Sequence, residues 1–198
     1  NSDTLRYEGS LGVDKETQSD YYRLQAGWRY GESEDVQDAE NGTLEALYQH
    51  RLSERVYDGV ELNVYHDQMA SLNYRARSSV ALGRHFIRTD RVVLSAEAGP
   101  GYVIEKKREE KEGFIAGRVA QRLEVLISPT LQVWQTVEYI PNLGDSAVFF
   151  INGEAGLETA LWSNLSLLLT VEDRYDSQPA EDKKSNDWTT ATSLKVRF

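Results

Sequence analysis

The sequence predicts an all-β protein, an antiparallel up-and-down transmembrane β-barrel. Three observations lead to this prediction. Apolar and polar residues alternate along most of the chain, short and long connections alternate between these segments, and aromatic residues recur near the segment ends. Side chains of a β-strand point alternately to its two faces, so an alternating segment can present one face to lipid and the other to a polar interior.

The clearest alternation is the last stretch, residues 187–198. Trp188, Leu194 and Phe198 fall on an apolar face, whereas Lys195 and Arg197 fall on the opposite one. About eleven segments of roughly 9 to 13 residues show this pattern, a length that suits tilted strands crossing a bilayer core. They are Leu5–Val13, Tyr22–Tyr30, Thr43–Gln49, Val56–His66, Tyr74–Phe86, Val92–Ile104, Phe114–Val125, Leu131–Tyr139, Ala147–Leu161, Leu165–Arg174 and Trp188–Phe198.

The connections alternate in kind. Tight ones contain a hydroxyl residue after an apolar one, and the connections between them are longer and polar. The tight connections are Arg51–Glu54, Ile87–Asp90, Ile127–Thr130 and Leu161–Asn164, and the longer ones are Gly31–Gly42, Asp67–Asn73, Glu105–Gly113, Pro141–Ser146 and Tyr175–Asp187. Outer-membrane barrels have short periplasmic turns and longer external loops. If Phe198 ends at the periplasmic side, every longer loop is external; we expect Glu105–Gly113 to continue two strands outward as a charged hairpin.

Aromatic residues fit the same orientation, because Tyr and Trp favour membrane interfaces. We expect two girdles on the lipid-facing side. The external one contains Tyr7, Trp28, Tyr30, Tyr74, Tyr102, Tyr139 and Trp188, and the periplasmic one contains Tyr22, Phe86, Trp162 and Phe198. A soluble barrel or sandwich, whose strands also alternate, stays open as an alternative in which these aromatics are core residues.

The composition limits the other classes of protein. A chain of 198 residues suits one domain, residues 1–198, and no Pro, Gly or Ser tract divides it. The mean hydropathy of −0.55 is too polar for helical membrane spans. The chain has no Cys, which excludes disulfides and thiol catalysis, and its net charge of −10 argues against nucleic acid as a partner.

An odd number of strands is unexpected, because bacterial single-chain barrels close with an even number. The opening Asn1–Thr4 has the composition of the second half of a turn. We therefore expect a first strand upstream, missing from this chain, and about twelve strands in the intact protein. Gly99-Pro100-Gly101 is interpreted as a kink or bulge within a strand.

Three segments resemble a known family. Leu94–Tyr102, Glu172–Pro179 and Lys195–Phe198 are similar to a Gram-negative family, domain of unknown function 481, whose members are described as salt-induced outer-membrane proteins. The resemblance covers nearly the whole chain. It implies an outer-membrane barrel and a link to salt or envelope stress, and it supplies no catalytic or binding residues.

The face opposite the lipid would form a charged lumen. Its candidate network is Arg75, Arg77, Glu97, Arg118, Glu138, Glu172, Arg174 and Arg197. On the whole face opposite the lipid, basic and acidic residues are roughly equal in number. This balance favours a lumen largely filled by Arg–Glu pairs, so that the barrel is structural or binds a partner. The alternative is a narrow ion or small-solute channel whose selectivity those charges set.

An outer-membrane enzyme is the least favoured alternative. The chain has three histidines and no nucleophile-elbow or zinc-protease motif, and a His66–Asp67 pair at the external rim is the one catalytic candidate. We expect no cofactor and no metal. The acidic segment Gly31–Gly42 lacks a calcium-loop pattern and is interpreted as a solvated loop.

The partners expected of such a barrel follow from its location. They are outer-membrane lipid and lipopolysaccharide, the barrel assembly machinery through the C-terminal strand, and an unidentified protein partner.

Overall fold

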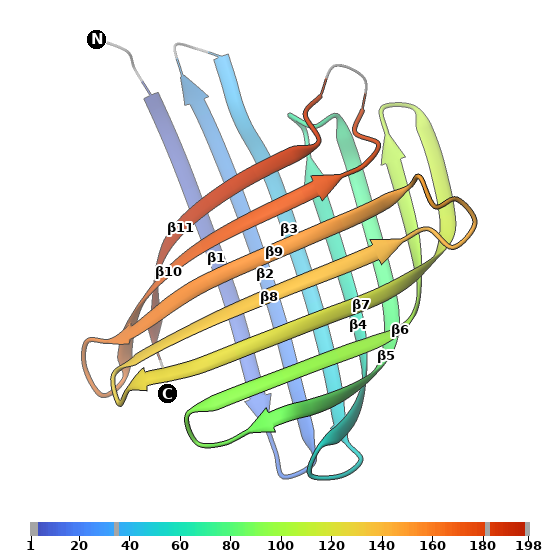
Figure 1. Ribbon diagram of the computed structural model, residues 1–198. Helices are drawn as coiled ribbons and strands as arrows, with labels where there is room; N and C mark the ends of the chain where they lie inside the picture. Colours follow the sequence, from blue (N-terminus) through green and yellow to red (C-terminus); the bar gives the residue numbers. More distant parts are fainter. Residues whose placement is uncertain (1–3, 34–35, 181–182, 197–198) are drawn as a thin grey trace.

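The computed structural model describes residues 4–33, 36–180 and 183–196, which form one antiparallel sheet (Figure 1). Neighbours in the sequence are neighbours in the sheet from β1 to β11. The strands are β1 Thr4–Glu16, β2 Asp20–Ser33, β3 Val36–Arg51, β4 Val56–Asp67, β5 Leu72–Arg88, β6 Val92–Lys107, β7 Glu110–Ser128, β8 Leu131–Pro141, β9 Phe149–Ala160, β10 Leu165–Asp176 and β11 Asn186–Val196. The predicted all-β up-and-down architecture is confirmed. No helix in the described part of the chain is long and apolar enough to cross a membrane.

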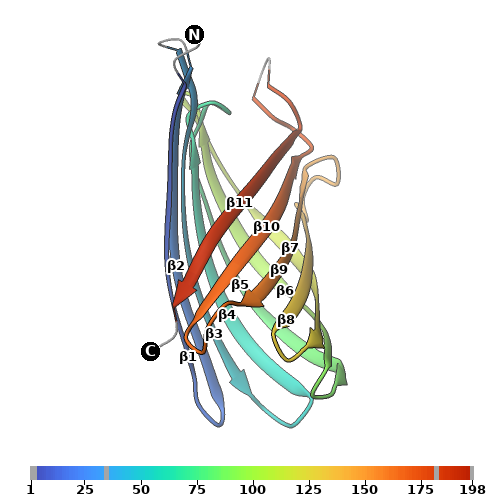
Figure 2. The same ribbon diagram turned by 90° about the vertical axis from the view of Figure 1, so that its left-hand side faces the viewer.

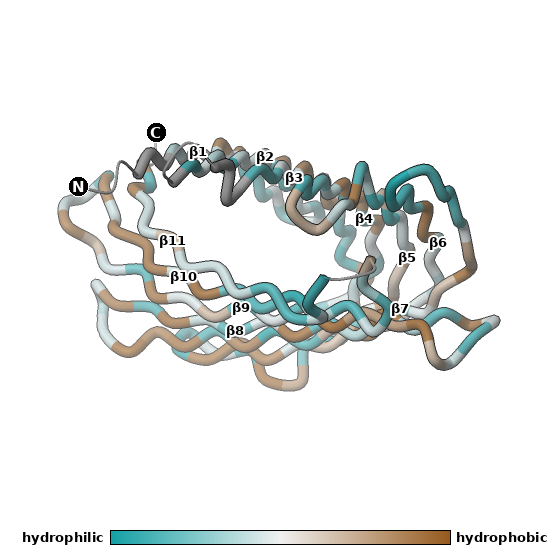
Figure 3. Tube along the Cα trace, turned by 90° about the horizontal axis from the view of Figure 1, so that it is seen from above, coloured by the Kyte–Doolittle hydropathy of each residue, from teal (hydrophilic) through white to brown (hydrophobic). Residues whose placement is uncertain are grey.

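The sheet curls into an incomplete, flattened barrel. Seen from above, β1–β3 form one wall, β8–β10 form the opposite wall, and β5 and β6 form the curved end between them (Figure 3). Within the described residues β1 and β11 are the two edges of the sheet and do not pair with each other. Both run in the same direction, because each step from one strand to the next reverses the chain and the number of steps between them is even (Figures 1 and 2).

The tight turns lie at one end of the barrel and the longer connections at the other, which we call the turn end and the loop end (Figure 1). Hydroxyl side chains hold the tight turns. Ser53 Oγ accepts a hydrogen bond from the Val56 amide at 3.1 Å, and Thr89 Oγ1 accepts one from the Val92 amide at 3.0 Å. These side chains replace backbone partners that a short turn leaves unsatisfied.

The prediction of a long loop over Gly31–Gly42 is wrong. β2 and β3 continue through this segment, with Gly31 opposite Ala39 and Ser33 opposite Val36. Beyond the apolar band a strand has no lipid to face, so its side chains need not alternate, and the alternation ends before the strand does. The charged hairpin expected over Glu105–Gly113 is confirmed, because β6 extends to Lys107 and β7 begins at Glu110.

The two faces of the sheet differ in chemistry. The convex face exposes aliphatic and aromatic side chains such as Leu11, Leu24, Val80 and Leu82. The concave inner face carries the ion pairs, together with a small apolar cluster formed by Val103, Ala116, Ile140 and Phe150, against which Phe114 packs. The exposed apolar surface is far more extensive than scattered surface residues, and it suits a lipid bilayer.

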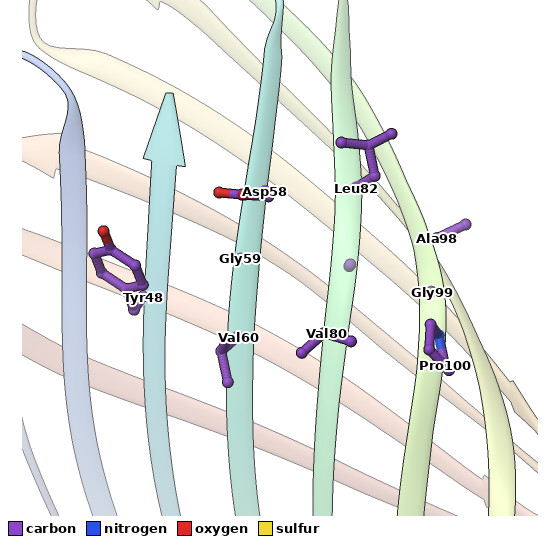
Figure 4. A pocket seen from close by; sticks show the side chains of 10 residues that line it. Tyr48, Asp58, Gly59, Val60, Val80, Leu82, Ala98, Gly99 and Pro100 are labelled. Atoms are coloured by element: carbon purple, nitrogen blue, oxygen red, sulfur yellow. The ribbon is translucent and has the colours of Figure 1, made fainter. Parts of the chain in front are cut away.

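The pairing of β5 with β6 is interrupted in mid-strand. Ser79 lies opposite Gly101 and Leu82 lies opposite Ala98, and the residues between them are unpaired without a shift of register. Pro100 has no N–H to donate to the ladder. A shallow hollow of about 390 Å³ opens here on the convex face, lined by Val80, Leu82 and Pro100 among others (Figure 4). The predicted kink therefore takes the form of an interruption and not of a bulge.

Candidate functional site

The densest polar contacts lie at mid-height on the inner face and form what we call the central cluster: Glu61, Arg77, Glu97, Arg118 and Glu138. Arg118 on β7 pairs with Glu61 at 2.8 Å, with Glu97 at 2.5 Å and with Glu138. Arg77 on β5 pairs with Glu61 at 2.7 Å and with Glu138 at 2.9 Å. The planar guanidinium group of Arg carries five N–H donors and can donate hydrogen bonds to several carboxylates at once. A Lys ammonium group has three donors and a less fixed geometry.

The central cluster is largely shielded from solvent. The Arg118 side chain is 8% exposed, and the four other members are nearly as buried. Neutral side-chain amides donate further hydrogen bonds to these carboxylates: Asn152 Nδ2 donates to Glu138 at 2.8 Å, and Gln49 Nε2 donates to Glu97 at 3.4 Å. Charges taken out of water need such multiple partners to offset their desolvation.

These residues meet because of strand curvature as well as alternation. They come from β4 to β8, which bend around the closed end of the flattened barrel (Figure 3). Side chains three strands apart therefore reach one another across the concave face. Arg118 to Glu61 spans β7 to β4, and Arg77 to Glu138 spans β5 to β8.

A second group, the loop-end cluster, contains Arg75, Glu105, Lys107 and Asp176. Arg75 on β5 contacts Glu105 on β6 at 2.7 Å and Asp176 on β10 at 2.5 Å. Lys107 contacts the same two carboxylates at 3.1 and 3.3 Å. The Arg75 guanidinium also lies 3.9 Å above the ring of Phe150. Since β5 and β6 lie across the interior from β10, this cluster links two walls of the barrel.

Other ion pairs on the inner face are more open to water. Arg174 pairs with Glu172 at 2.9 Å, and their side chains are 33% and 32% exposed. Lys195 on β11 pairs with Glu158 on β9 at 3.2 Å. The Arg174 guanidinium lies 4.3 Å from the ring centre of Tyr65 on the facing wall. These pairs lie toward β9–β11, away from the buried central cluster.

The structure brings together most of the predicted network residues, but in three groups. Arg77, Glu97, Arg118 and Glu138 join the central cluster, Arg75 joins the loop-end cluster, and Glu172 pairs with Arg174. Arg197 lies outside the described residues.

The residues predicted for the external girdle lie at outward strand positions near the loop end, whereas Tyr22, Phe86 and Trp162 of the periplasmic girdle are exposed near the turn end. In the external girdle Trp28, Tyr102, Tyr139 and Trp188 are exposed, and Tyr30 and Tyr74 are half-buried. Phe198 lies outside the described residues. Their role at a membrane interface stays a prediction.

Sequence reasoning did not assign Asp176 and Glu105 as partners inside the barrel, nor the apolar cluster around Ile140 and Phe150. Asp176 and Glu105 lie where alternating segments were expected to end. Extending the two-residue period past those ends would have placed both on the inner face. The apolar cluster had no such signal, because apolar residues were assigned to the lipid side.

The structure offers no catalytic dyad at His66 and Asp67. Adjacent strand residues point to opposite faces, and His66 Nδ1 bonds to the carbonyl oxygen of Asn73 at 2.8 Å. Asp67 instead accepts hydrogen bonds from the Tyr65 hydroxyl at 2.5 Å and the Ala70 amide at 2.9 Å. In the described part of the chain, no three His, Asp or Glu side chains are grouped to hold a metal ion.

Family and structure comparisons agree with this architecture. The model of a protein family of unknown function, DUF481, matches residues 1–198. The chain belongs to the DUF481 family. No curated protein matches the chain by sequence.

Solved structures similar to this DUF481 protein are outer-membrane porins. A structure titled NanC porin has a TM-score of 0.64 and 8% identity, with 100% of this chain and 97% of that chain covered. A KdgM porin has a TM-score of 0.58 and 10% identity, with 100% and 99% covered. A KdgM porin in complex with disordered oligogalacturonate has a TM-score of 0.55 and 9% identity, with the same coverage. At such low identity the similarity establishes the fold, which is that of a bacterial outer-membrane β-barrel.

Proposed function

We propose that this DUF481 protein spans the bacterial outer membrane as a narrow channel for ions and small polar solutes. The observation that carries the proposal is the uneven filling of the interior. The central cluster fills the curved end between β4 and β8, where Arg118 is 8% exposed. Near β9–β11, Arg174 and Glu172 are 33% and 32% exposed, and Lys195 is 41% exposed although its partner Glu158 is only 11% exposed. A passage lined by these hydrated charges would run beside the filled end.

A wide pore is disfavoured by contacts that cross the interior. Arg75 and Lys107 reach Asp176 on the far wall, and Arg174 packs over Tyr65. Barrels of about twelve strands also lie between filled eight-stranded barrels and open sixteen-stranded porins. The similarity to proteins titled porins supports transport over catalysis, and the proposed function is not enzymatic.

A filled structural barrel that binds a partner is the second candidate. The loop-end cluster and the apolar cluster around Phe150 favour it, because together they obstruct the loop end of the interior. In that case the loops, the lipopolysaccharide around them or an unidentified protein would be the relevant partners. The link of the family to salt or envelope stress stays a prediction under either candidate.

We also propose that one further strand closes the barrel. β1 and β11 run in the same direction and present unpaired edges within the described residues. One strand running the opposite way between them would pair antiparallel with both, and would leave no exposed edge in the hydrocarbon. If the barrel assembly machinery binds β11 during insertion, it would have to dissociate from β11 before the further strand pairs there and closes the barrel.

Planar-bilayer recording of the full-length protein tests the channel against the filled barrel. Discrete, steady conductance steps much smaller than those of a general porin would support the channel. A folded, heat-modifiable barrel that passes no current and gives no liposome swelling would contradict it and favour the filled barrel. The matched control is the same preparation after heat unfolding, which must be silent.

A further inference from the structure

Glu45 and Glu154 occupy inward strand positions and have no cationic partner among the described residues. Among the described residues, neither Glu45 on β3 nor Glu154 on β9 lies within ion-pair distance of Arg or Lys. Glu154 accepts one hydrogen bond, from Trp134 Nε1 at 2.6 Å, and that donor is neutral. Glu45 is half-buried. Both therefore contribute negative charge that the barrel itself does not neutralise.

These two carboxylates act on the same region of the interior. β3 and β9 belong to opposite walls of the flattened barrel (Figure 3). Both nevertheless lie next to the central cluster. Glu45 is diagonal to Glu61, because Leu47 lies opposite Glu61 and Glu45 lies opposite Asn63. Glu154 is diagonal to Glu138, because Asn152 lies opposite Glu138 and Glu154 lies opposite Thr136. Like charges held close to one another within a narrow polar passage attract mobile cations and repel anions.

The cations nearby are already engaged. Arg77, which acts on Glu45, is shared by Glu61 and Glu138, and Arg23 pairs with Asp14 at 3.0 Å. The central cluster itself holds three glutamates and two arginines. With the Arg23–Asp14 pair included, six carboxylates in this region face three guanidinium groups: Asp14, Glu45, Glu61, Glu97, Glu138 and Glu154 against Arg23, Arg77 and Arg118.

We propose that the passage conducts small cations in preference to anions, and that Glu45 and Glu154 determine this preference. The inference rests on the proposed channel function and specifies its solute class. The contacts that cross the interior limit the width of the passage, whereas Glu45 and Glu154 set its preference for cations over anions.

The test is the reversal potential of the reconstituted full-length protein in a KCl gradient. The wild type is expected to favour K⁺ over Cl⁻, and each of Glu45→Gln and Glu154→Gln is expected to lower the permeability ratio toward one. The change expected per residue is about fivefold, which corresponds to about 1 kcal/mol, the Coulomb energy of one charge about 4 Å away in water. In the Glu154→Gln variant the new side-chain carbonyl can still accept the Trp134 hydrogen bond, so the fold is retained.

Asp58→Asn is the matched control. Asp58 is an exposed carboxylate that lines the hollow on the convex face (Figure 4), two residues after the start of β4. Its removal changes the net charge equally without touching the interior. Its permeability ratio should equal that of the wild type. A conducting channel that prefers Cl⁻, or one whose preference is unchanged in the Glu45→Gln/Glu154→Gln double variant, would overturn the inference and leave the channel function standing. A silent wild-type barrel would overturn both.

Discussion

Replacing Arg118 with Met should destabilise the barrel more than any other single charge removal on the inner face. The substitution leaves Arg77 as the one cation paired with Glu61 and Glu138, and leaves Glu97 with neutral partners such as the amide of Gln49. Breaking a buried ion pair by removing one partner costs about 3–5 kcal/mol, because the remaining charge stays buried without compensation. With an m-value of about 2 kcal/mol/M, the urea midpoint should fall by about 2 M.

The measurement is urea unfolding in detergent micelles, followed by tryptophan fluorescence and by heat-modifiable gel mobility. Arg122→Met is the matched control. Arg122 lies on the same face of β7, is 35% exposed and pairs with Glu124 at 2.6 Å. An exposed pair of this kind contributes about 0–1 kcal/mol. Equal midpoints for the two variants would refute the assignment of Arg118 as the centre of a buried network.

Rescue provides a second check on the same reasoning. Adding Glu97→Gln to Arg118→Met removes the carboxylate that the first substitution strands. The double variant should therefore be more stable than the sum of the two single effects predicts, by about 0.5–3 kcal/mol, as expected for residues in direct contact. Strict additivity would mean that the two side chains do not interact in the folded barrel.

Three other predictions concern particular contacts. Gly99→Val should abolish most folding, because a Cβ at this position would overlap the carbonyl oxygen of Val80 on β5. Gly153→Ala should fold normally, because the nearest atom to a Cβ there is 4.0 Å away, and heat-modifiable gel mobility measures the folding of both variants. Brominated lipid should quench the tryptophan fluorescence of a variant whose single tryptophan is Trp188, which is exposed on the convex face. It should not quench the fluorescence of a variant whose single tryptophan is Trp134, which donates a hydrogen bond to an inward carboxylate. Equal quenching in the two variants would contradict the assignment of the lipid-facing and inner faces. Asp176→Asn should raise single-channel conductance, because it weakens a contact between opposite walls, and an unchanged conductance would show that this contact does not limit the passage.

The sequence by itself determined the strands, their order and the division of their two faces. Alternation with a period of two is a local property, since each backbone pleat turns successive side chains to opposite sides whatever lies beyond. For the same reason the inward placement of Arg77, Arg118 and Glu138 could be predicted residue by residue. The turn chemistry at Ser53 and Thr89 fixed which end of the barrel carries the short connections.

Local alternation could not give the extent of the strands beyond the apolar band. The segment Gly31–Gly42 has the composition of a polar loop because charge and glycine dominate it, yet backbone pairing between β2 and β3 continues there. Hydrogen bonds between strands do not require any side-chain pattern, so the sequence carries no mark of where this pairing stops.

Only the tertiary structure decided which charges pair and where the interior stays open. Equal numbers of Arg and Glu on one face are compatible with many pairings, and the choice depends on the curvature that brings β4, β6 and β8 around Arg118 on β7. The same curvature leaves Glu45 and Glu154 on opposite walls without a cation within ion-pair distance among the described residues. Charge compensation in a barrel depends on distances across the interior, which are set by how the whole sheet bends and not by any single strand.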